Sequence, residues 1–258
     1  MSADFSSLAG ANVSIHVVGA GGTGSAMIGK LVKLALVASA LGQSWGVTVW
    51  DGDTVSPANV GRQDFGPADV GRKKADVLVN RVNLSRGLRW RSLPEAFSRH
   101  NAQDRYTFFN GITILVGCVD TSASRRELQA VFETLDDCIW VDCGNSKDSG
   151  QVVLGARLDG RKIVPSTADL FSEILEDVND VDATPSCSVA DAIARQDPMI
   201  NEMMAVSAAN LLWRVLRFGA LDHHGVFVDA AGGVTSPIPV DPDYWRSLGW
   251  HEEPAETA

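Results

Sequence analysis

Short β-branched runs alternate with amphipathic segments along the first half of the chain. Residues 13–18 form the first such run, and from Ser25 to about Leu41 apolar residues recur three and four positions apart. The apolar positions of this second segment are Met27, Ile28, Leu31, Val32, Ala35 and Ala38. We therefore predict a strand, a turn and a helix whose apolar face packs on a sheet.

The alternation continues beyond the first helix. The predicted strands are residues 47–50, 112–118 and 139–142, and the predicted helices are residues 73–82 and 122–135. Strands that alternate with helices form parallel sheets through right-handed crossovers. The fold class we predict is therefore α/β, with a Rossmann-like, doubly wound and mostly parallel sheet.

The pattern changes after Gln151. Residues 152–158 and 162–164 are strand-like and flank Asp159-Gly160-Arg161, which is typical of a hairpin turn. The sheet should therefore gain an antiparallel C-terminal extension.

An acidic segment follows the hairpin. Residues 165–185 contain six acidic residues and no Lys or Arg, which predicts a solvated, mobile crossover. A long amphipathic helix, from about Pro198 to Phe218, and a last strand at 226–229 come next. We expect His223-His224 to be loop residues before that strand, and residues 252–258 to be a frayed tail.

The length of 258 residues fits one large α/β domain or two small ones. We predict one domain over 1–251, with a nucleotide-binding half at 13–150 and a partner-binding half at 151–251. Hydrophobic residues make up 45% and charged residues 21%, as in ordinary globular proteins. The net charge of −10 disfavours nucleic acid as a partner, because an acidic surface repels phosphate backbones.

The four cysteines form no C-x-x-C pair, which argues against a structural zinc site and a disulfide framework and favours a reducing, cytoplasmic location. Cys118, Cys138 and Cys143 lie in or beside predicted strands, so we expect buried, small apolar side chains. Lys30 and Lys33 interrupt the most apolar helix, so we expect no membrane span.

The turn after the first strand reads Gly19-Ala20-Gly21-Gly22-Thr23-Gly24, followed by a helix. Glycines in this pattern let a phosphate approach backbone N–H groups at the positive end of a helix, so we assign the turn to nucleotide binding. A tight strand-to-helix turn without a ligand is the alternative. Asp51, at the end of the next strand, suits the ribose hydroxyls, with a solvated strand-end carboxylate as the alternative.

Two polar stretches extend this pattern: DGDTVSPANVGRQ at 51–63 and VGRKK at 70–74. They resemble the D-x-D-x-V-x-x-x-N-x-x-R-Q and V-G-x-x-K motifs of the ThiF/MoeB branch of E1-like enzymes, which adenylate the C-terminal glycine of ubiquitin-like proteins. The resemblance covers about Val13 to Leu135. It implies an ATP-dependent adenylating enzyme that uses Mg²⁺, whereas a nicotinamide cofactor needs no such polar set.

The resemblance also assigns roles to individual residues. It implies a nucleotide site formed by Gly19, Gly21, Gly22, Gly24, Asp51, Asn59, Arg62, Gln63 and Lys74, with Asn59, Arg62, Gln63 and Lys74 at the phosphates. The resemblance also assigns Asp120 to Mg²⁺ binding and to catalysis. Adenylation brings a carboxylate to a polyanion, so a guanidinium fork, a lysine charge and a metal-holding acid are the groups it needs.

Each of these residues has a structural alternative. Arg62 can form a surface ion pair, and Lys74 can lie on a solvated helix face, with Lys73 competing for its role. Asp120 can cap the following helix. The two arginines of that helix are expected to be solvated or structural: Arg125 and Arg126.

Thr184-Pro185-Ser186-Cys187 resembles the T-C segment whose cysteine bonds to the activated partner in some family members. Cys187 is therefore a candidate nucleophile, because helix dipoles can stabilise its thiolate, although neighbouring acids raise a thiol pKa. A structural or regulatory thiol is the alternative.

The segment from Cys187 to Phe218 resembles the ThiF-related proteins of PRTRC mobile-element cassettes, which implies a ubiquitin-like β-grasp partner. Met203 and Met204 in it are expected to be helix core. The C-x-x-C zinc motif and the N-terminal helix of the ThiF branch are missing, so a homodimer is left open. Alternatives to an adenylating enzyme are a catalytically silent nucleotide-binding module and an NAD(P)-linked oxidoreductase.

Overall fold

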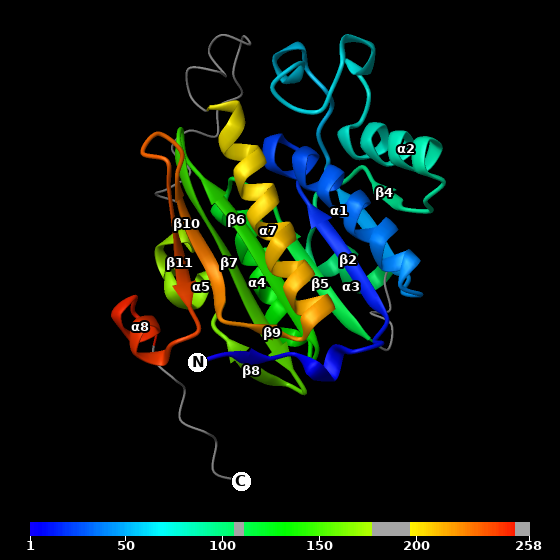
Figure 1. Cartoon of the computed structure of the whole chain (residues 1–258). Coiled ribbons are helices and arrows are strands. Elements are labelled where there is room, and N and C mark those ends of the chain that lie inside the picture. The colour runs from blue at the N-terminus through cyan, green and yellow to red at the C-terminus, as the bar shows by residue number, and fades with distance from the viewer. Residues whose placement is uncertain (106–110, 177–196, 251–258) are drawn as a thin grey trace.

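The computed structural model describes residues 1–105, 111–176 and 197–250, and it shows a central sheet with helices on both faces (Figure 1). The strands are β1 (Ala3–Asp4), β2 (Val13–Val18), β3 (Trp45–Trp50), β4 (Arg91–Leu93), β5 (Ile112–Gly117), β6 (Cys138–Asn145), β7 (Ser149–Leu158), β8 (Arg161–Val164), β9 (Ala220–Leu221), β10 (His223–Asp229) and β11 (Val234–Pro239). The helices are α1 (Gly22–Ala40), α2 (Lys74–Arg86), α3 (Arg99–Arg105), α4 (Ser122–Thr134), α5 (Thr167–Leu170), α7 (Pro198–Phe218) and α8 (Pro242–Ser247), with short 3₁₀ segments η1 (Ser6–Leu8), η2 (Pro57–Asn59), η3 (Pro67–Asp69) and η4 (Ser172–Leu175).

The large sheet has the strand order β11-β10-β7-β6-β5-β2-β3-β4, and β8 also pairs with β7. Strands β6, β5, β2, β3 and β4 are parallel, whereas β7, β8, β10 and β11 add antiparallel pairs. The predicted fold class is confirmed. Strand β2 lies between β3 and β5, so the order reverses there, and α/β sheets bind ligands at the carboxyl ends of strands at such a switch point.

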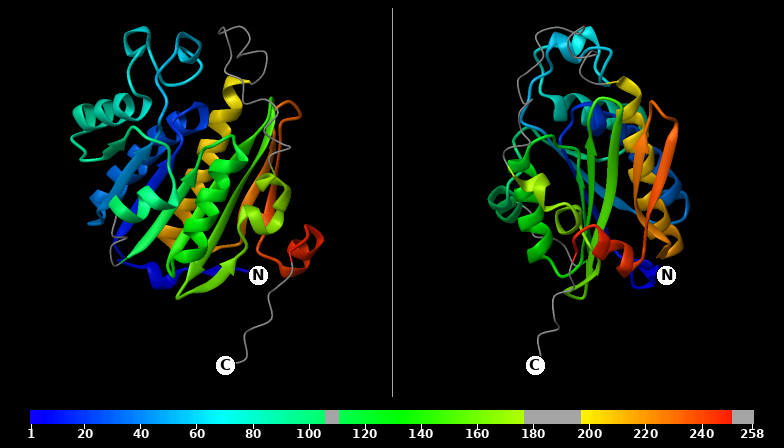
Figure 2. Two further views of the ribbon diagram at one scale, coloured as in Figure 1. Left: turned by 180° about the vertical axis from the view of Figure 1, so that it is seen from behind. Right: turned by 90° about the vertical axis from the view of Figure 1, so that its left-hand side faces the viewer.

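Helices α1, α2 and α7 cover one face of the sheet, and α3 and α4 cover the other (Figure 2). Every predicted apolar position of α1, from Met27 to Ala38, is buried. On the opposite face Trp50, Phe132 and Trp140 form the centre of a second apolar cluster. The two clusters sandwich the sheet and fix where the carboxyl ends of its strands lie.

The boundaries of α7 agree with the sequence prediction, and local chemistry explains them. Asp197 accepts a hydrogen bond from the Met199 amide at 2.7 Å, and Pro198 occupies the first turn, where no amide hydrogen is needed. Gly219 ends the helix in the left-handed region at φ 66°. Met204 is buried and Met203 packs against the core, as predicted.

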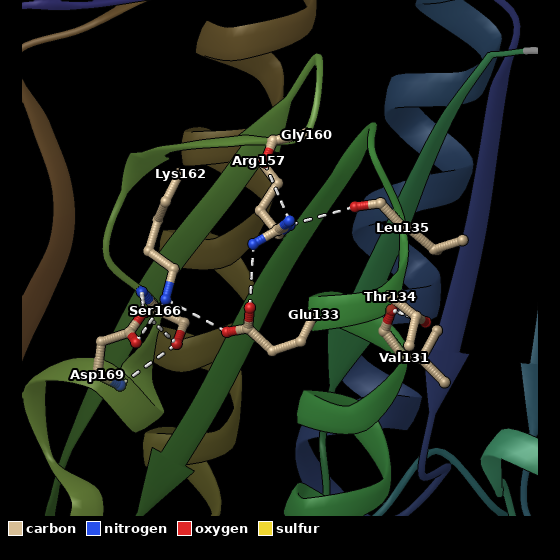
Figure 3. Close-up of polar contacts among 9 residues, drawn as sticks. All are labelled: Val131, Glu133, Thr134, Leu135, Arg157, Gly160, Lys162, Ser166 and Asp169. Carbon is tan, nitrogen blue, oxygen red and sulfur yellow. Dashed lines mark hydrogen bonds and ion pairs between the residues drawn. The ribbon is translucent and has the colours of Figure 1, made fainter. Parts of the chain in front are cut away.

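The predicted hairpin is confirmed. Asp159 and Gly160 both have positive φ, 51° and 72°, as a two-residue turn of the right twist requires. Figure 3 shows that a charged network holds this hairpin against α4: Glu133 binds Arg157 at 3.0 Å and Lys162 at 3.3 Å. The hairpin is therefore fixed to the helical layer at the edge of the sheet.

The first part of the predicted crossover, residues 165–176, forms the helical turns α5 and η4, and its mobility stays a prediction. Ser166 and Asp169 cap α5, with the Ser166 hydroxyl donating to Asp169 at 2.8 Å, and Asp169 also binds Lys162 at 2.7 Å (Figure 3). Ala168 and Leu170 are buried. The acidic composition did not reveal these turns, because one of the acids, Asp169, is used in a helix cap and an ion pair. Residues 177–185 and 252–258 lie outside the described part.

The histidine pair is not in a loop. His223 and His224 begin β10, and His224 is fully buried with Nδ1 2.9 Å from the Leu154 carbonyl oxygen. The predicted last strand is followed by β11 and α8, which the sequence analysis did not find. Strand β11 escaped detection because its residues are mostly exposed and include two prolines.

Among the described residues one helix, α1, is long and apolar enough to cross a membrane by length and composition alone, at a mean hydropathy of 1.2. This stretch contains both Lys30 and Lys33, and the expectation of no membrane span stays a prediction. In the fold 56% of this stretch is buried, and it packs on β2 and α7. Burial in the core accounts for its composition.

Candidate functional site

The glycine turn joins β2 to α1 at the switch point of the sheet. Gly19 has φ 91°, and a Cβ there would lie 2.4 Å from the Cys118 carbonyl oxygen at the end of β5. A Cβ on Gly24 would lie 1.9 Å from the Gly19 carbonyl oxygen. Side chains are thus sterically excluded, and α1 begins at Gly22, so its first-turn amides lie within the turn.

Asp51, which directly follows β3, forms a hydrogen bond to the same turn. Its carboxylate accepts hydrogen bonds from the Ala20 amide at 2.6 Å and from the Asp53 amide at 2.8 Å. Burial raises the pKa of this carboxyl group, against the lowering effect of these amides and of Lys74. The alternative of a fully solvated strand-end carboxylate is wrong.

Lys74 is the buried lysine of the pair at the start of α2. Its side chain is 9% exposed, and Nζ binds Asp53 at 2.8 Å. Lys73 is exposed and donates to the Gly52 carbonyl oxygen at 2.6 Å. The alternative of a solvated helix face for Lys74 is therefore wrong, and Lys74 lies close enough to Asp51 to lower its pKa.

The loop between β3 and α2 carries three residues that were predicted to contact the phosphates, and one of them, Gln63, lies beside the turn. The Asn59 side chain caps η2 by accepting from the Ser56 amide at 2.8 Å. Gln63 Nε2 lies 3.9 Å from the position of a Cβ on Gly21, so its amide is next to the glycine turn. Arg62 is partly buried, and burial lowers the pKa of its guanidinium.

A cavity of about 620 Å³ lies beside this loop. It is lined by Ser25, Ile28, Gly29, Gly61, Gln63, Asp64, Phe65, Gly66, Leu78, Arg81 and Val82. Gln63 Oε1 is buried in the described structure without a hydrogen-bond donor, while its amide nitrogen is on the side of Gly21. Gln63 therefore has hydrogen-bonding capacity beside the turn.

Asp120 follows β5 and is exposed. The N-cap of α4 is Thr121, which accepts from the Ser124 amide at 3.3 Å, so the alternative role of Asp120 as cap is wrong. Within the described ranges no three His, Cys, Asp or Glu side chains gather as a metal cluster. Mg²⁺ commonly uses one or two carboxylates together with waters and phosphates, and a single exposed carboxylate fits that mode.

Arg125 is structural, one of the two roles expected for it. Its guanidinium binds Asp142 at 3.4 Å and donates to the Val119 carbonyl oxygen at 2.9 Å, next to Asp120. Asp142 is buried, and burial raises the pKa of its carboxyl group. Arg126 donates to the Leu175 carbonyl oxygen.

Sequence reasoning missed a polar junction between α7 and the glycine turn. Asn201 Oδ1 accepts from Thr23 Oγ1 at 2.8 Å and from Asn145 Nδ2 at 3.2 Å. A Cβ on Gly22 would lie 2.7 Å from the Asn201 amide. An Asn in the first turn of a long apolar helix is the only local signal, and it does not reveal its distant partners.

The ThiF family model matches residues 8–228 of the chain, from before β2 to the second-last residue of β10. The chain belongs to the ThiF family. This confirms the family resemblance, which the motifs in 51–63 and 70–74 carried, while the PRTRC subtype stays a prediction.

Solved structures share the fold of this ThiF-family chain. A crystal structure of PaaA has a TM-score of 0.64 at 13% identity, over 89% of this chain and 73% of PaaA. E. coli MccB with succinimide has a TM-score of 0.61 at 13% identity, over 91% of this chain and 64% of MccB. E. coli MccB with ATP has a TM-score of 0.57 at 15% identity, over 91% of this chain and 65% of MccB. No curated protein matches the chain.

The cysteines of this ThiF-family chain lie in different surroundings. Cys138 and Cys143 are buried, as predicted, but the same prediction is wrong for Cys118, which follows β5 at the glycine turn and is partly exposed. Cys187, the candidate nucleophile, lies outside the described residues. Its role stays a prediction.

Proposed function

We propose that the protein is an ATP-dependent adenylating enzyme that activates a substrate carboxylate. One observation carries the proposal: the ends of three chain segments meet at one glycine turn. Asp51 binds the Ala20 amide, Gln63 lies next to Gly21, and the Cys118 carbonyl contacts Gly19. This arrangement occupies the switch point of the sheet, where a nucleotide binds in such folds.

The proposed reaction joins a carboxylate oxygen to the α-phosphorus of ATP and breaks the bond to pyrophosphate. The products are an acyl adenylate and pyrophosphate. Both reactants are anions, so the site must neutralise charge and hold them in line. The amides of the glycine turn and the Arg62 guanidinium suit the phosphates, and Lys74 supplies a point charge once it is drawn from Asp53.

Asp51 is the proposed ribose ligand, and Asn59 and Gln63 are proposed to assist at the phosphates. Asp120 would hold Mg²⁺, which offsets negative charge on the leaving pyrophosphate. Asp120 follows Cys118 by two residues, and that placement beside Gly19 supports its assignment.

The solved neighbours support this chemistry. MccB was crystallised with ATP, and also with AMPCPP together with selenomethionine-labelled MccA, which is therefore a polypeptide. By analogy we propose that this chain activates the carboxylate of a polypeptide, and specifically of a ubiquitin-like β-grasp protein in the cytoplasm. Transfer to Cys187 and a homodimeric state belong to the same proposal.

Pyrophosphate–ATP exchange tests the proposal, using the partner that co-purifies with the native protein. Arg62→Ala and Asp120→Ala should each lower exchange about 100-fold, or about 2.7 kcal/mol, because positioned charge supplies most of this catalysis. Arg161→Ala and Asp136→Ala, which remove exposed charges near the β7–β8 hairpin, are the matched controls. Full exchange in both site variants would reject the assignment.

Two further measurements separate the alternatives. Calorimetry with ATP and NADH distinguishes an oxidoreductase, which would bind NADH far more tightly, and ATP binding without AMP formation would indicate a silent module. Intact-mass analysis of the exchange mixture tests Cys187: a thiol-sensitive conjugate that Cys187→Ser abolishes is expected, and its absence in the unmutated protein would make the cysteine structural.

A further inference from the structure

Two cysteines lie side by side where β5 and β6 approach the glycine turn. The parallel register pairs Gly117, the last residue of β5, with Asp142 of β6, so the residues that follow them, Cys118 and Cys143, are neighbours too. The Cys118 amide donates to the Val18 carbonyl oxygen at 2.8 Å, which keeps Cys118 in line with the sheet.

Both side chains are on the same face of the sheet. Cys143 belongs to the apolar cluster under α1 and α7, and Cys118 packs against that cluster. A Cβ on Gly24 of α1 would lie 3.4 Å from the Cys118 Cβ. Neighbouring strands are about 4.8 Å apart, and disulfides join Cα atoms about 4.4–6.8 Å apart, so a bond needs no large movement of the backbone.

We propose that Cys118 and Cys143 form a reversible disulfide under peroxide, and that this bond weakens nucleotide binding at the adjacent glycine turn. Only the second half of the proposal, the effect on ATP, rests on the proposed function. Disulfides of proteins in reducing compartments are usually transient and redox-sensing, which suits a pair at a nucleotide site.

Exposure distinguishes the roles of the two thiols. Cys118 is partly exposed and meets hydrogen peroxide, whereas Cys143 is buried, and the hydrogen bond to Cys118 together with burial raises the pKa of its thiol. The Cys118 sulfur attacks one peroxide oxygen, the O–O bond breaks, and sulfenic acid and water form. The Cys143 sulfur then attacks that sulfenic sulfur. An S–S bond forms, the S–O bond breaks, and hydroxide leaves with the Cys143 proton as a second water.

The glycine turn is packed too closely against Cys118 to accommodate a displacement of that residue. The Cys118 carbonyl oxygen already occupies the place of a side chain at Gly19, which follows β2 directly. Even the small displacement of Cys118 toward β6 that the bond requires would therefore shift the Cys118 carbonyl against Gly19 and the start of the loop that carries Asp120. Because cores and turns are close-packed, such a shift reduces complementarity to the phosphates.

Peptide mapping tests the bond. The purified protein is treated with hydrogen peroxide, the remaining thiols are blocked with N-ethylmaleimide, and the unreduced digest is analysed by mass spectrometry. A Cys118–Cys143 cross-link that dithiothreitol removes is expected. Cys143→Ser should lose it, whereas Cys138→Ser, at the other end of β6, should keep it. No cross-link, or pairing of Cys118 with Cys187 instead, would overturn the proposal.

Calorimetric titration with ATP tests the consequence. Peroxide should weaken binding about tenfold in the unmutated protein, dithiothreitol should restore it, and Cys143→Ser should bind ATP equally before and after peroxide. A cross-link that leaves ATP affinity unchanged would also overturn the proposal. If Cys143→Ser does not fold, the unmutated protein still decides both points. If the cross-link is found but the protein shows no pyrophosphate–ATP exchange, the proposed function is contradicted and the disulfide is not.

Discussion

At the scale of single residues, the site depends on where side chains are absent as much as on where they are present. Gly24 is excluded from carrying a Cβ by the Gly19 carbonyl oxygen, whereas Gly29, in the same helix, has nothing within 4 Å of that position. Packing therefore requires glycine at position 24 of this helix but not at position 29. One makes room for backbone packing at the turn, and the other carries only the cost of glycine in a helix.

Gly24→Ala should destabilise the protein by about 1–3 kcal/mol, because overpacking against backbone cannot be relieved by a side-chain movement. It should also weaken ATP binding. Gly29→Ala is the matched control and should stabilise the protein by about 0.5–1 kcal/mol. Urea unfolding and ATP titration measure both effects. Equal stability of the two variants would show that the turn relaxes freely.

At the scale of elements, α7 joins the nucleotide half to the rest of the sheet. Its first turn meets the glycine turn through Asn201, and Lys30 of α1 binds Glu202 at 2.6 Å one residue later. The ion pair is partly exposed and contributes little to folding stability, whereas the hydrogen bonds of Asn201 are buried. We infer that Asn201 positions the glycine turn from a distant part of the chain.

Asn201→Leu should cost about 1–3 kcal/mol of folding free energy, because Thr23 and Asn145 lose a buried acceptor while the volume is conserved. ATP affinity should fall with it. Asn210→Leu, on the exposed side of the same helix, is the matched control and should change neither quantity by more than about 0.5 kcal/mol. Chemical unfolding and calorimetry provide the two readouts. Unchanged ATP affinity in Asn201→Leu would confine the residue to a role in stability.

At the scale of the whole molecule, two buried histidines link stability to pH. His16 accepts a hydrogen bond from Trp50 Nε1 at 3.1 Å, and His224 packs edge-on against Trp245. Burial lowers the pKa of each to about 4. Both are therefore neutral in the folded protein, and protonation is disfavoured relative to the unfolded chain, where histidine titrates near pH 6.5.

The free energy of unfolding should be fully retained above pH 6.5 and should fall as the pH drops from 6.5 toward 4. Below pH 6.5 the unfolded chain binds protons that the folded protein excludes. Each histidine should therefore lower the free energy of unfolding by roughly 3 kcal/mol once the pH reaches 4. The buried carboxyl groups of Asp51 and Asp142, with raised pKa, oppose part of this loss. Urea unfolding between pH 8 and pH 4.5 measures the slope.

His16→Gln, which keeps an acceptor for Trp50, should flatten that slope, and His100→Gln, on the surface of α3, should leave it unchanged. The same slope in His16→Gln and in the unmutated protein would contradict the assignment.

Much of the fold followed from local patterns. The periodicity of apolar residues located β2, α1 and α4 to within a few residues, and Pro198 and Gly219 bounded α7, because start and stop signals act within a few residues of chain. The predicted hairpin is confirmed for the same reason. Composition was a poorer guide: the acidity of 165–176 suggested a solvated segment, but Asp169 is used in a cap and an ion pair.

The sequence by itself determined the alternation of the main strands and helices, the fold class, the glycine turn and the motifs that resemble the ThiF family. Only the tertiary structure decided that Lys74 is buried on Asp53, that Asn201 contacts the glycine turn, and that Cys118 lies beside Cys143. These contacts join residues that are distant along the chain, and their partners are set by strand order and register. No periodicity within one segment encodes that information, because local pattern reports which face of an element is apolar and not what lies against it.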